Sequence, residues 1–235
     1  MRVNEPLDRE RHSRDAGMPR AYRGAMVRFA DRTAAGRALA RVLEQWRGTD
    51  AVVLGIPRGG VVVAAAVARE LGLPLDAVVV RKLGAAGREE FAVGAIADGV
   101  RIVTPSAVRW AGMSAEDVAR VEAQEREELQ RRAQTFGARR IDVRGRTALV
   151  VDDGVATGST AIAACRALRG QEPARIVLAV PVAPASWRPE TDAVDEFVCP
   201  HRIREFWAVG EFYDDFRQTT DAEVVELLST ASASE

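Results

Sequence analysis

Unbroken apolar runs along the chain alternate with segments in which apolar residues recur at helical spacing. The runs occupy residues 51–56, 75–80, 147–151 and 175–180, and a further short strand is expected at 193–198. Because both faces of each run are apolar, they predict strands that are covered on both sides of a sheet. Helices between such strands favour parallel pairing. We therefore expect an α/β fold, with an open, mostly parallel, twisted sheet and helices on both faces.

Local signals between these runs give further predictions. Residues 1–24 are charged and polar with little periodicity, and they predict a mobile N-terminal arm. Residues 83–90 are rich in glycine and charge, which predicts a flexible loop. An Asp-Gly pair at residues 98–99 lies between two apolar stretches and predicts a hairpin turn. Ser114 and Asp117 form a capping box, which predicts the start of a charged helix that ends near residue 136.

The charge balance and the apolar runs narrow the function classes. The chain has 235 residues, for which one domain is the default, and 34 acidic side chains against 33 basic ones. This balance argues against a general nucleic-acid or membrane-surface binder, although a local basic face stays open. The longest apolar run, residues 61–68, is too short to span a membrane, and the N-terminus lacks the apolar stretch of a signal peptide.

The few cysteines and histidines exclude further classes of protein. Cys165 and Cys199 are too few for a disulfide scaffold, so we expect a cytoplasmic protein in a reducing compartment. His12 and His201 are isolated in the sequence, and no nucleophile elbow is present. The sequence therefore indicates neither a zinc site nor a Ser-His-Asp hydrolase.

Residues 149–160 carry the clearest chemical signal. A buried strand delivers Asp152 and Asp153 into a turn of glycine and small hydroxyl residues that opens a helix. Backbone N–H groups and the helix dipole would form a cup for phosphate, and the carboxylates could accept hydrogen bonds from vicinal hydroxyls. A ribose 5-phosphate site is the function that this predicts; an Asp-Asp cap before an ordinary tight turn is the alternative. The predicted phosphate ligands are Ala156, Thr157, Gly158, Ser159 and Thr160.

The segment Val-Val-Asp-Asp-Gly-Val-Ala-Thr-Gly-Ser-Thr at residues 150–160 resembles the phosphoribosyl pyrophosphate (PRPP) signature of type I phosphoribosyltransferases. The resemblance extends in element order over residues 29–216. It is closer still to an uncharacterised bacterial group of that family, which carries a helical insert before the signature strand. It implies that Asp152 and Asp153 hold the ribose hydroxyls while residues 156–160 hold the 5-phosphate.

The resemblance also suggests how the chain is divided. We expect a phosphoribosyltransferase core over residues 25–220. It would contain the helical insert at 105–137, which is solvated or faces another subunit, and a small hood at 200–217. Residues 221–235 predict a C-terminal helix and tail.

The turn at residues 57–60 is a second candidate site. It follows a buried strand, its two glycines expose backbone N–H groups, and Arg58 offers a fork for phosphate oxygens. In the family the matching turn binds pyrophosphate and often contains a non-proline cis peptide, which falls at Pro57–Arg58. We therefore predict that Arg58, Gly59 and Gly60 bind pyrophosphate; the alternative is a glycine-rich helix start with a solvated arginine.

Arg81 and Lys82 end a predicted strand where the family's catalytic loop begins. Lys82 is the only lysine in the chain, and a compact charge on a flexible stem suits a contact that forms when a loop closes. The alternative for the two residues is a solvated pair at a strand end. Asp98 has two interpretations, an ordinary hairpin turn or the counterpart of the base-contacting glutamate in adenine phosphoribosyltransferases.

The aromatic segment 206–216 resembles the hood of hypoxanthine–guanine phosphoribosyltransferases. The resemblance implies that Trp207 stacks on the base, that the Ala208 backbone reads its edge, and that Asp214 contacts magnesium indirectly. A core aromatic cluster is the alternative. Ala156 departs from that pattern, because 6-oxopurine enzymes place an aspartate there and adenine enzymes do not. Proton transfer to a 6-oxopurine through position 156 is therefore excluded.

The leading hypothesis is transfer of the 5-phosphoribosyl group from PRPP to a nitrogen of a purine-like base, with Mg²⁺ as cofactor and release of pyrophosphate. Asp152 and Asp153 would hold the ribose, while Arg58, Arg81 and Lys82 would stabilise the leaving group. A PRPP- or nucleotide-binding regulator without turnover is the alternative, and a hydrolase acting on a phosphoribosyl site ranks last. The chain could form a homo-oligomer.

Overall fold

The computed structural model describes four stretches of the chain, residues 27–85, 88–97, 100–136 and 141–232. Its central sheet has the strand order β2-β1-β6-β7-β9, and every pairing is parallel. The strands are β1 (Val52–Gly55), β2 (Leu75–Ala77), β6 (Thr147–Val151), β7 (Arg175–Ala179) and β9 (Glu196–Val198). This arrangement confirms the α/β fold expected from the sequence. The predicted N-terminal arm lies outside the described residues.

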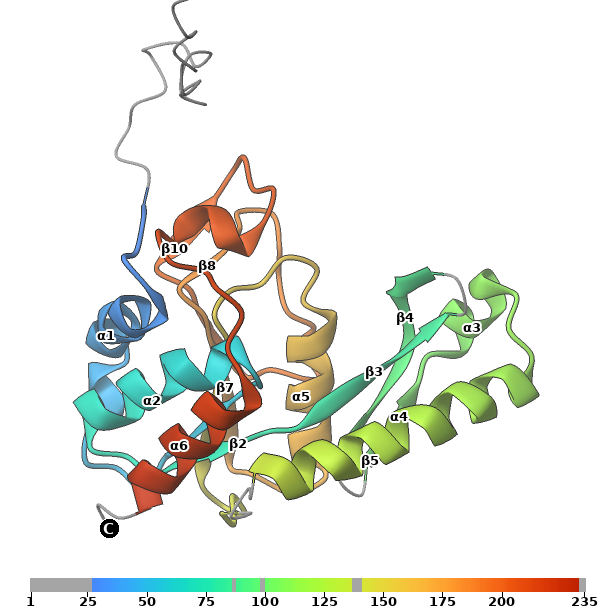
Figure 1. The fold of residues 1–235 in the computed structure, drawn as a ribbon, viewed down its shortest axis with the longest axis horizontal. Coiled ribbons are helices and arrows are strands. Elements are labelled where there is room, and N and C mark those ends of the chain that lie inside the picture. The colour runs from blue at the N-terminus through green and yellow to red at the C-terminus, as the bar shows by residue number, and fades with distance from the viewer. Residues whose placement is uncertain (1–26, 86–87, 98–99, 137–140, 233–235) are drawn as a thin grey trace, which may run out of the picture.

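Helices cover both faces of the sheet (Figure 1). Alternate strand residues point to opposite faces, so Val53 belongs to one core and Val52 to the other. On the Val52 side the covering helix is α5 (Ser159–Arg169). The helical elements on the Val53 side include α1 (Arg32–Val42), η2 (Glu44–Trp46), α2 (Gly59–Leu71) and α6 (Asp221–Ser232). Asp31 caps α1, because its Oδ1 accepts the Ala34 N–H over 2.7 Å.

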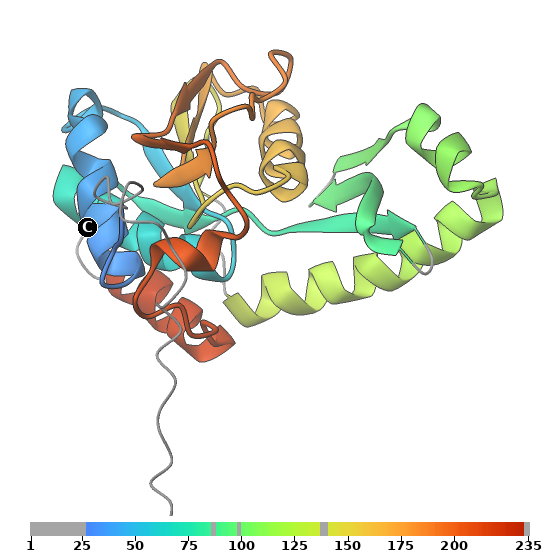
Figure 2. The same cartoon turned by 90° about the horizontal axis from the view of Figure 1, so that it is seen from above.

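Residues 80–136 form a side lobe that projects from the central sheet (Figure 2). It consists of the antiparallel strands β3 (Val80–Ala85), β4 (Arg88–Ala97) and β5 (Val100–Val103) and the helices α3 (Pro105–Ala111) and α4 (Ala115–Phe136). The predicted capping box is confirmed, because Ser114 N–H donates to Asp117 Oδ2 over 3.0 Å and Asp117 N–H donates to Ser114 Oγ over 3.1 Å. The strands and helices of the side lobe also share a small hydrophobic core of their own.

The flexible loop expected at residues 83–90 is wrong at both ends, because residues 83–85 belong to β3 and residues 88–90 belong to β4. Leu83 belongs to β3 and is fully buried, and Gly84 pairs with Ala92 of β4. Glycine and charge suggested a loop, but Leu83 packs in the core of the side lobe with Leu129 of α4. The strand expected at 75–80 also ends at Ala77, where the chain leaves the central sheet. The Asp98-Gly99 turn lies outside the described residues, but β4 and β5 on either side of it pair antiparallel as expected.

A small hood lies beyond the carboxyl end of β6. The parallel strands β8 (Val182–Pro184) and β10 (His201–Ile203) and the short helix η3 (Val209–Phe212) form it. Val155, which follows β6, donates its N–H to the carbonyl oxygen of Val182 over 3.0 Å. Phe29 bridges to Tyr213 and packs with Phe212, so the segment before α1 is part of the hood.

Two further expectations concern cysteines and membranes. Cys165 and Cys199 are free thiols, and burial raises the pKa of Cys165 to about 12. In the part of the chain that the structure describes, every helix is too short or too polar to cross a membrane.

Candidate active site

The predicted acid pair lies at the end of β6. Asp152 and Asp153 follow the strand directly, and the Asp153 N–H donates to Oδ1 of Asp152 over 2.8 Å. Burial and the charge of Asp153 raise the pKa of Asp152 well above its ordinary value. Burial also raises the pKa of Asp153, although the hydrogen bond and charge of Arg32 oppose the shift. Such a pair is costly to keep ionised unless a cation or donor groups meet it.

Arg32, the first residue of α1, is the cation that meets this pair. Its Nε lies 2.8 Å from Oδ2 of Asp153, and the two side chains are only 11% and 15% exposed. Its Nη1 donates to the carbonyl oxygen of Arg217 over 2.9 Å, and its guanidinium lies 4.0 Å from the ring centroid of Phe216. Arg32 was not among the residues selected from the sequence. The available signal was its place in the first turn of a helix, where the dipole disfavours a positive charge.

The glycine turn and the acid pair are in direct contact. A Cβ atom on Gly59 would lie 2.2 Å from Oδ2 of Asp153 and 2.7 Å from Nε of Arg32. A Cβ on Gly60 would lie 2.8 Å from Oδ1 of Asp152. These distances are too short for real carbon contacts, so both positions require glycine to let the backbone approach the carboxylates. The fold thus joins two motifs that are far apart in the sequence.

Arg58 lies at the start of α2, beside this contact. The peptide bond between Pro57 and Arg58 is cis, as the family resemblance implied. Nη1 of Arg58 lies 3.4 Å from Oδ1 of Asp221, the first residue of α6, and both side chains are about one-third exposed (30% and 32%). Arg58 is therefore accessible near the glycine turn.

The predicted phosphate turn has the expected shape. Gly158 has a φ of +80°, and α5 begins at Ser159, so the turn leads directly into a helix N-terminus. Ala156 and Thr157 are exposed, and Thr157 Oγ1 lies 3.3 Å from Ser159 Oγ. Exposed hydroxyls and a helix N-terminus form a surface that an anion can reach.

Trp187 covers one side of this turn and was missed by the sequence analysis. Its Nε1 donates to the carbonyl oxygen of Thr157 over 3.1 Å. A Cβ on Gly158 would lie 2.3 Å from the Trp187 ring, so glycine is needed here for packing as well as for its positive φ. Trp187 follows β8, about 30 positions further on, and no local pattern marks it as a partner of the turn.

The hood holds the acid pair from the other side. The Tyr213 hydroxyl donates to the carbonyl oxygen of Asp153 over 2.6 Å, and burial raises the pKa of Tyr213 far above its ordinary value. Gly154 packs so closely on Val209 of η3 that a Cβ there would be 2.6 Å from that side chain. The aromatic segment therefore fixes the signature backbone, in addition to the roles that the resemblance suggested for it.

The proposed catalytic residues of β3 have other surroundings. Arg81 belongs to the side lobe, and its Nε lies 2.5 Å from Oε2 of Glu125 on α4. Lys82 follows in β3, opposite Ala95 of β4. Among the described contacts of Asp152 and Asp153, none involves Arg81 or Lys82. Asp98 lies outside the described residues.

The hood candidates are accessible. Trp207 is 85% exposed, and Ala208 precedes η3 in extended backbone. Asp214 is also exposed and forms an ion pair with Arg28. Among the described residues, no three potential metal ligands gather at one place. Asp214 is therefore not part of such a group.

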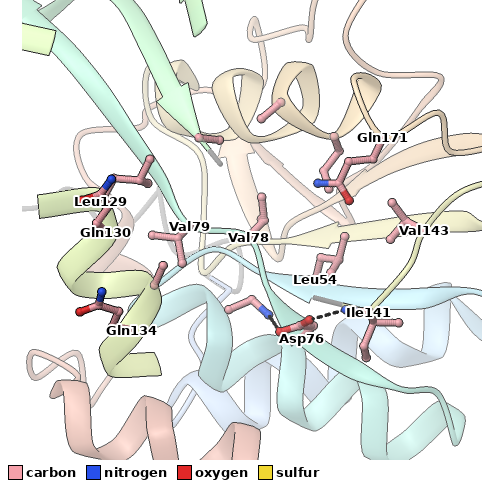
Figure 3. A pocket seen from close by; sticks show the side chains of 15 residues that line it. Leu54, Asp76, Val78, Val79, Leu129, Gln130, Gln134, Ile141, Val143 and Gln171 are labelled. Atoms are coloured by element: carbon pink, nitrogen blue, oxygen red, sulfur yellow. Dashed lines mark hydrogen bonds between the residues drawn. The ribbon is translucent and has the colours of Figure 1, made fainter. Parts of the chain in front are cut away.

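A cavity of about 480 Å³ lies elsewhere, between β2, α4 and α5 (Figure 3). Asp76 on its wall is buried, and its two carboxylate oxygens accept the N–H groups of Ala77 (2.7 Å) and Ile141 (2.9 Å). Among the described residues that line this cavity, none belongs to the turns at 57–60 or 152–160. The cavity is therefore separate from the surface formed by the two turns.

Comparisons with known proteins identify the family of the chain. The family of the phosphoribosyl transferase domain matches residues 30–217. Two Mycobacterium tuberculosis proteins named as phosphoribosyl transferases, from strains CDC 1551 and H37Rv, are each 47% identical over 88% of this chain. The chain spans 47% of the length of those relatives, about half.

A solved structure gives the same result for the fold. The crystal structure of TT1426 from Thermus thermophilus is 41% identical, with a TM-score of 0.73, and the match covers 86% of this chain and 97% of that one. The family match over residues 30–217 and the 47% identity to those relatives lead to one conclusion. The chain belongs to the phosphoribosyltransferase family.

Proposed function

We propose that the protein transfers the 5-phosphoribosyl group from PRPP to a ring nitrogen of a purine-like base and releases pyrophosphate. The observation that carries this proposal is the contact between the two turns. Gly59 and Gly60 lie against the carboxylates of Asp153 and Asp152, and the phosphate turn follows directly. A ligand that carries a diol between two phosphate groups matches this order of sites.

Each group of residues would bind a different part of PRPP. Asp152 and Asp153 would accept hydrogen bonds from the ribose hydroxyls, and the turn at 156–160 would hold the 5-phosphate through backbone N–H groups and hydroxyls. Arg58 and the glycine turn would hold the pyrophosphate. As pyrophosphate leaves, the anomeric carbon gains cationic character, and fixed donors at the leaving group lower the barrier.

The side lobe and the hood would complete the site. Arg81 would have to leave Glu125 before it could reach pyrophosphate, and Lys82 would move with the same strand. Trp207 and Ala208 would contact the base, and exposure of Trp207 leaves its ring accessible. Asp98 is retained as a candidate contact to the base. Ala156 cannot exchange a proton with the base, so base selection would depend on these other groups.

Magnesium is part of the proposal as a companion of the PRPP diphosphate. Bound there, the ion would supply charge neutralisation of the leaving group. Asp214 would contact it indirectly, after separating from Arg28. We place the reaction in nucleotide salvage in the cytoplasm.

A PRPP-binding regulator without turnover is the second candidate. The pairing of Arg81 with Glu125 favours it, because this arginine is engaged within the side lobe. A pyrophosphate-release assay with PRPP, Mg²⁺ and a panel of purines, pyrimidines and related heterocycles separates the two. Release with at least one base supports transfer. Calorimetric binding of PRPP without release of pyrophosphate by any base supports the regulator, and absence of binding contradicts both.

A further inference from the structure

We propose that Arg32 is a positioning residue that keeps Asp153 ionised, so that the acid pair can accept hydrogen bonds from both ribose hydroxyls. The inference rests on the proposed function, because it assigns the acid pair to the ribose. It concerns a residue of α1, which lies outside both the signature turn and the glycine turn.

The geometry places one cation against two carboxylates. Among the described residues, Arg32 is the cation in contact with the acid pair, through the 2.8 Å bond to Asp153. Asp152 lies one residue further back, and its carboxylate accepts the Asp153 N–H. Adjacent carboxylates with little access to water cannot both stay ionised easily, since each disfavours the charge of the other.

Arg32 is fixed in this position by three groups. Besides Asp153, its guanidinium donates to the Arg217 carbonyl oxygen and lies over the Phe216 ring. Gly59 leaves the space in which the guanidinium sits, since a Cβ there would be 2.7 Å from Nε. A lysine could keep the charge but not the flat, forked contacts, so it should replace Arg32 only in part.

In the part of the chain that the structure describes, the other groups around the pair do not supply a second positive side chain. From the hood, Tyr213 donates its hydroxyl to the Asp153 backbone, and Arg217 directs its own side chain to Asp215 and Glu223. From α2, Gly59 and Gly60 offer only backbone. Arg58 is directed to Asp221 of α6.

This arrangement predicts a pH signature. Burial already raises the pKa of Asp153, and loss of Arg32 removes the main groups that oppose the shift. A protonated carboxyl forms a weaker, uncharged hydrogen bond to a ribose hydroxyl. Below the raised pKa, the ionised fraction falls about tenfold per pH unit, so a variant without the cation should lose affinity most at low pH.

Calorimetric titration with PRPP and Mg²⁺ from pH 6 to pH 9 tests this prediction. We expect Arg32→Gln to weaken binding about 10- to 100-fold at pH 6, with the loss shrinking as the pH rises. The PRPP affinity of Arg32→Lys should lie between those of wild type and Arg32→Gln at every pH. Arg144→Gln is the matched control, because Arg144 and Glu172 form an ion pair with side chains about two-thirds exposed (66% and 67%), and its profile should equal wild type. A pH-independent loss in Arg32→Gln, or no loss, overturns the proposal.

A measurement without PRPP makes the two proposals separable. Carboxyl ¹³C NMR titration, with Asp153 assigned through Asp153→Asn, should show a higher titration midpoint in Arg32→Gln than in wild type. An unchanged midpoint overturns the role of Arg32. If Arg32→Gln does not fold, Arg32→Lys carries the test in both experiments, and a midpoint and pH profile equal to wild type overturn the proposal. A wild-type chain that binds no PRPP at any pH, while the midpoint shifts as expected, overturns the proposed function and with it the ribose role.

Discussion

The side lobe and the acid pair use arginine–carboxylate pairs in different ways. On α4, Arg131 and Glu128 are three residues apart and 2.7 Å from Nε to Oε2, with side chains 53% and 30% exposed. Arg32 and Asp153 are 121 positions apart and nearly buried. Water screens the first kind, so each such pair contributes only about 0.3–0.5 kcal/mol. Removing one partner of the second kind leaves a buried charge without compensation.

The difference indicates what each pair stabilises. Pairs between residues three or four apart within α4 stabilise that helix locally and would do so in an isolated peptide as well. The Arg32–Asp153 pair requires α1, β6 and the hood to be assembled, and it is adjacent to the proposed ribose site. Substitutions in the lobe should therefore change stability slightly, whereas substitutions at the acid pair should change both stability and ligand binding.

The largest difference in protein stability is expected between substitutions of the two aspartates of the acid pair. Asp153→Asn leaves Arg32 buried without its charged partner, and we expect a loss of about 3 kcal/mol in the free energy of unfolding. Asp152→Asn removes a repelling charge, and we expect stability equal to or above wild type at pH 7. Urea unfolding of both variants measures this. Equal destabilisation by the two would contradict the assignment of Arg32 to Asp153.

The pH dependence of Asp152→Asn sharpens the test. The folded state raises the pKa of Asp152, so the folded protein retains a proton that the unfolded chain releases. Ionisation of Asp152 then lowers stability as pH rises from its unfolded pKa, about 4, toward the higher folded value. The stability gained by Asp152→Asn should therefore grow with pH above about 4. A gain confined to acid pH would contradict this sign.

The next largest effect on stability is expected from a substitution in the glycine turn. Gly59→Ala places a carbon 2.2 Å from the Asp153 carboxylate, so either the carboxylate or α2 must move. We expect a stability loss of about 1–3 kcal/mol and weaker PRPP binding. Gly170→Ala is the control, since its nearest contact would be 3.3 Å and its φ is −63°. Thermal unfolding and calorimetry measure both, and similar losses in the two variants would contradict a specific contact at Gly59.

The sequence allowed prediction of the sheet, the acid pair and both turns because each is encoded by neighbouring residues. The apolar run at 147–151 and the turn after it form one local pattern, and so does the capping box at Ser114. Arg32 and Trp187 could not be found in this way, because their contacts depend on how distant elements pack. The loop expected at 83–90 was wrong for the same reason: local glycine and charge were outweighed by burial of Leu83 against α4.

Two tryptophans offer a matched comparison of smaller effects. Trp187→Phe removes the hydrogen bond to the Thr157 carbonyl oxygen, and we expect a loss of about 1 kcal/mol in PRPP binding, roughly fivefold in affinity. Trp46 has a buried Nε1 without a hydrogen-bond partner among the described residues. Trp46→Phe should therefore leave PRPP affinity unchanged and be close to neutral in stability. Equal PRPP affinities in both variants would contradict a role of Trp187 in PRPP binding at the phosphate turn.

The smallest effect should come from Glu128 on α4. Hydrogen bonds from Arg131 and Arg132 lower its pKa to about 2. A lowered carboxyl pKa stabilises the fold above the unfolded pKa of about 4, and that contribution is lost as the pH falls toward 2. Because the side chain is 30% exposed, solvent screening limits the effect, and Glu128→Gln should cost about 0.3–1 kcal/mol at pH 7. The cost should shrink in high salt, and PRPP affinity should not change. Calorimetric unfolding at two salt concentrations measures the first, and a PRPP titration measures the second. A change in affinity would show that the side lobe is coupled to the site through α4 and would weaken the contrast between the two regions.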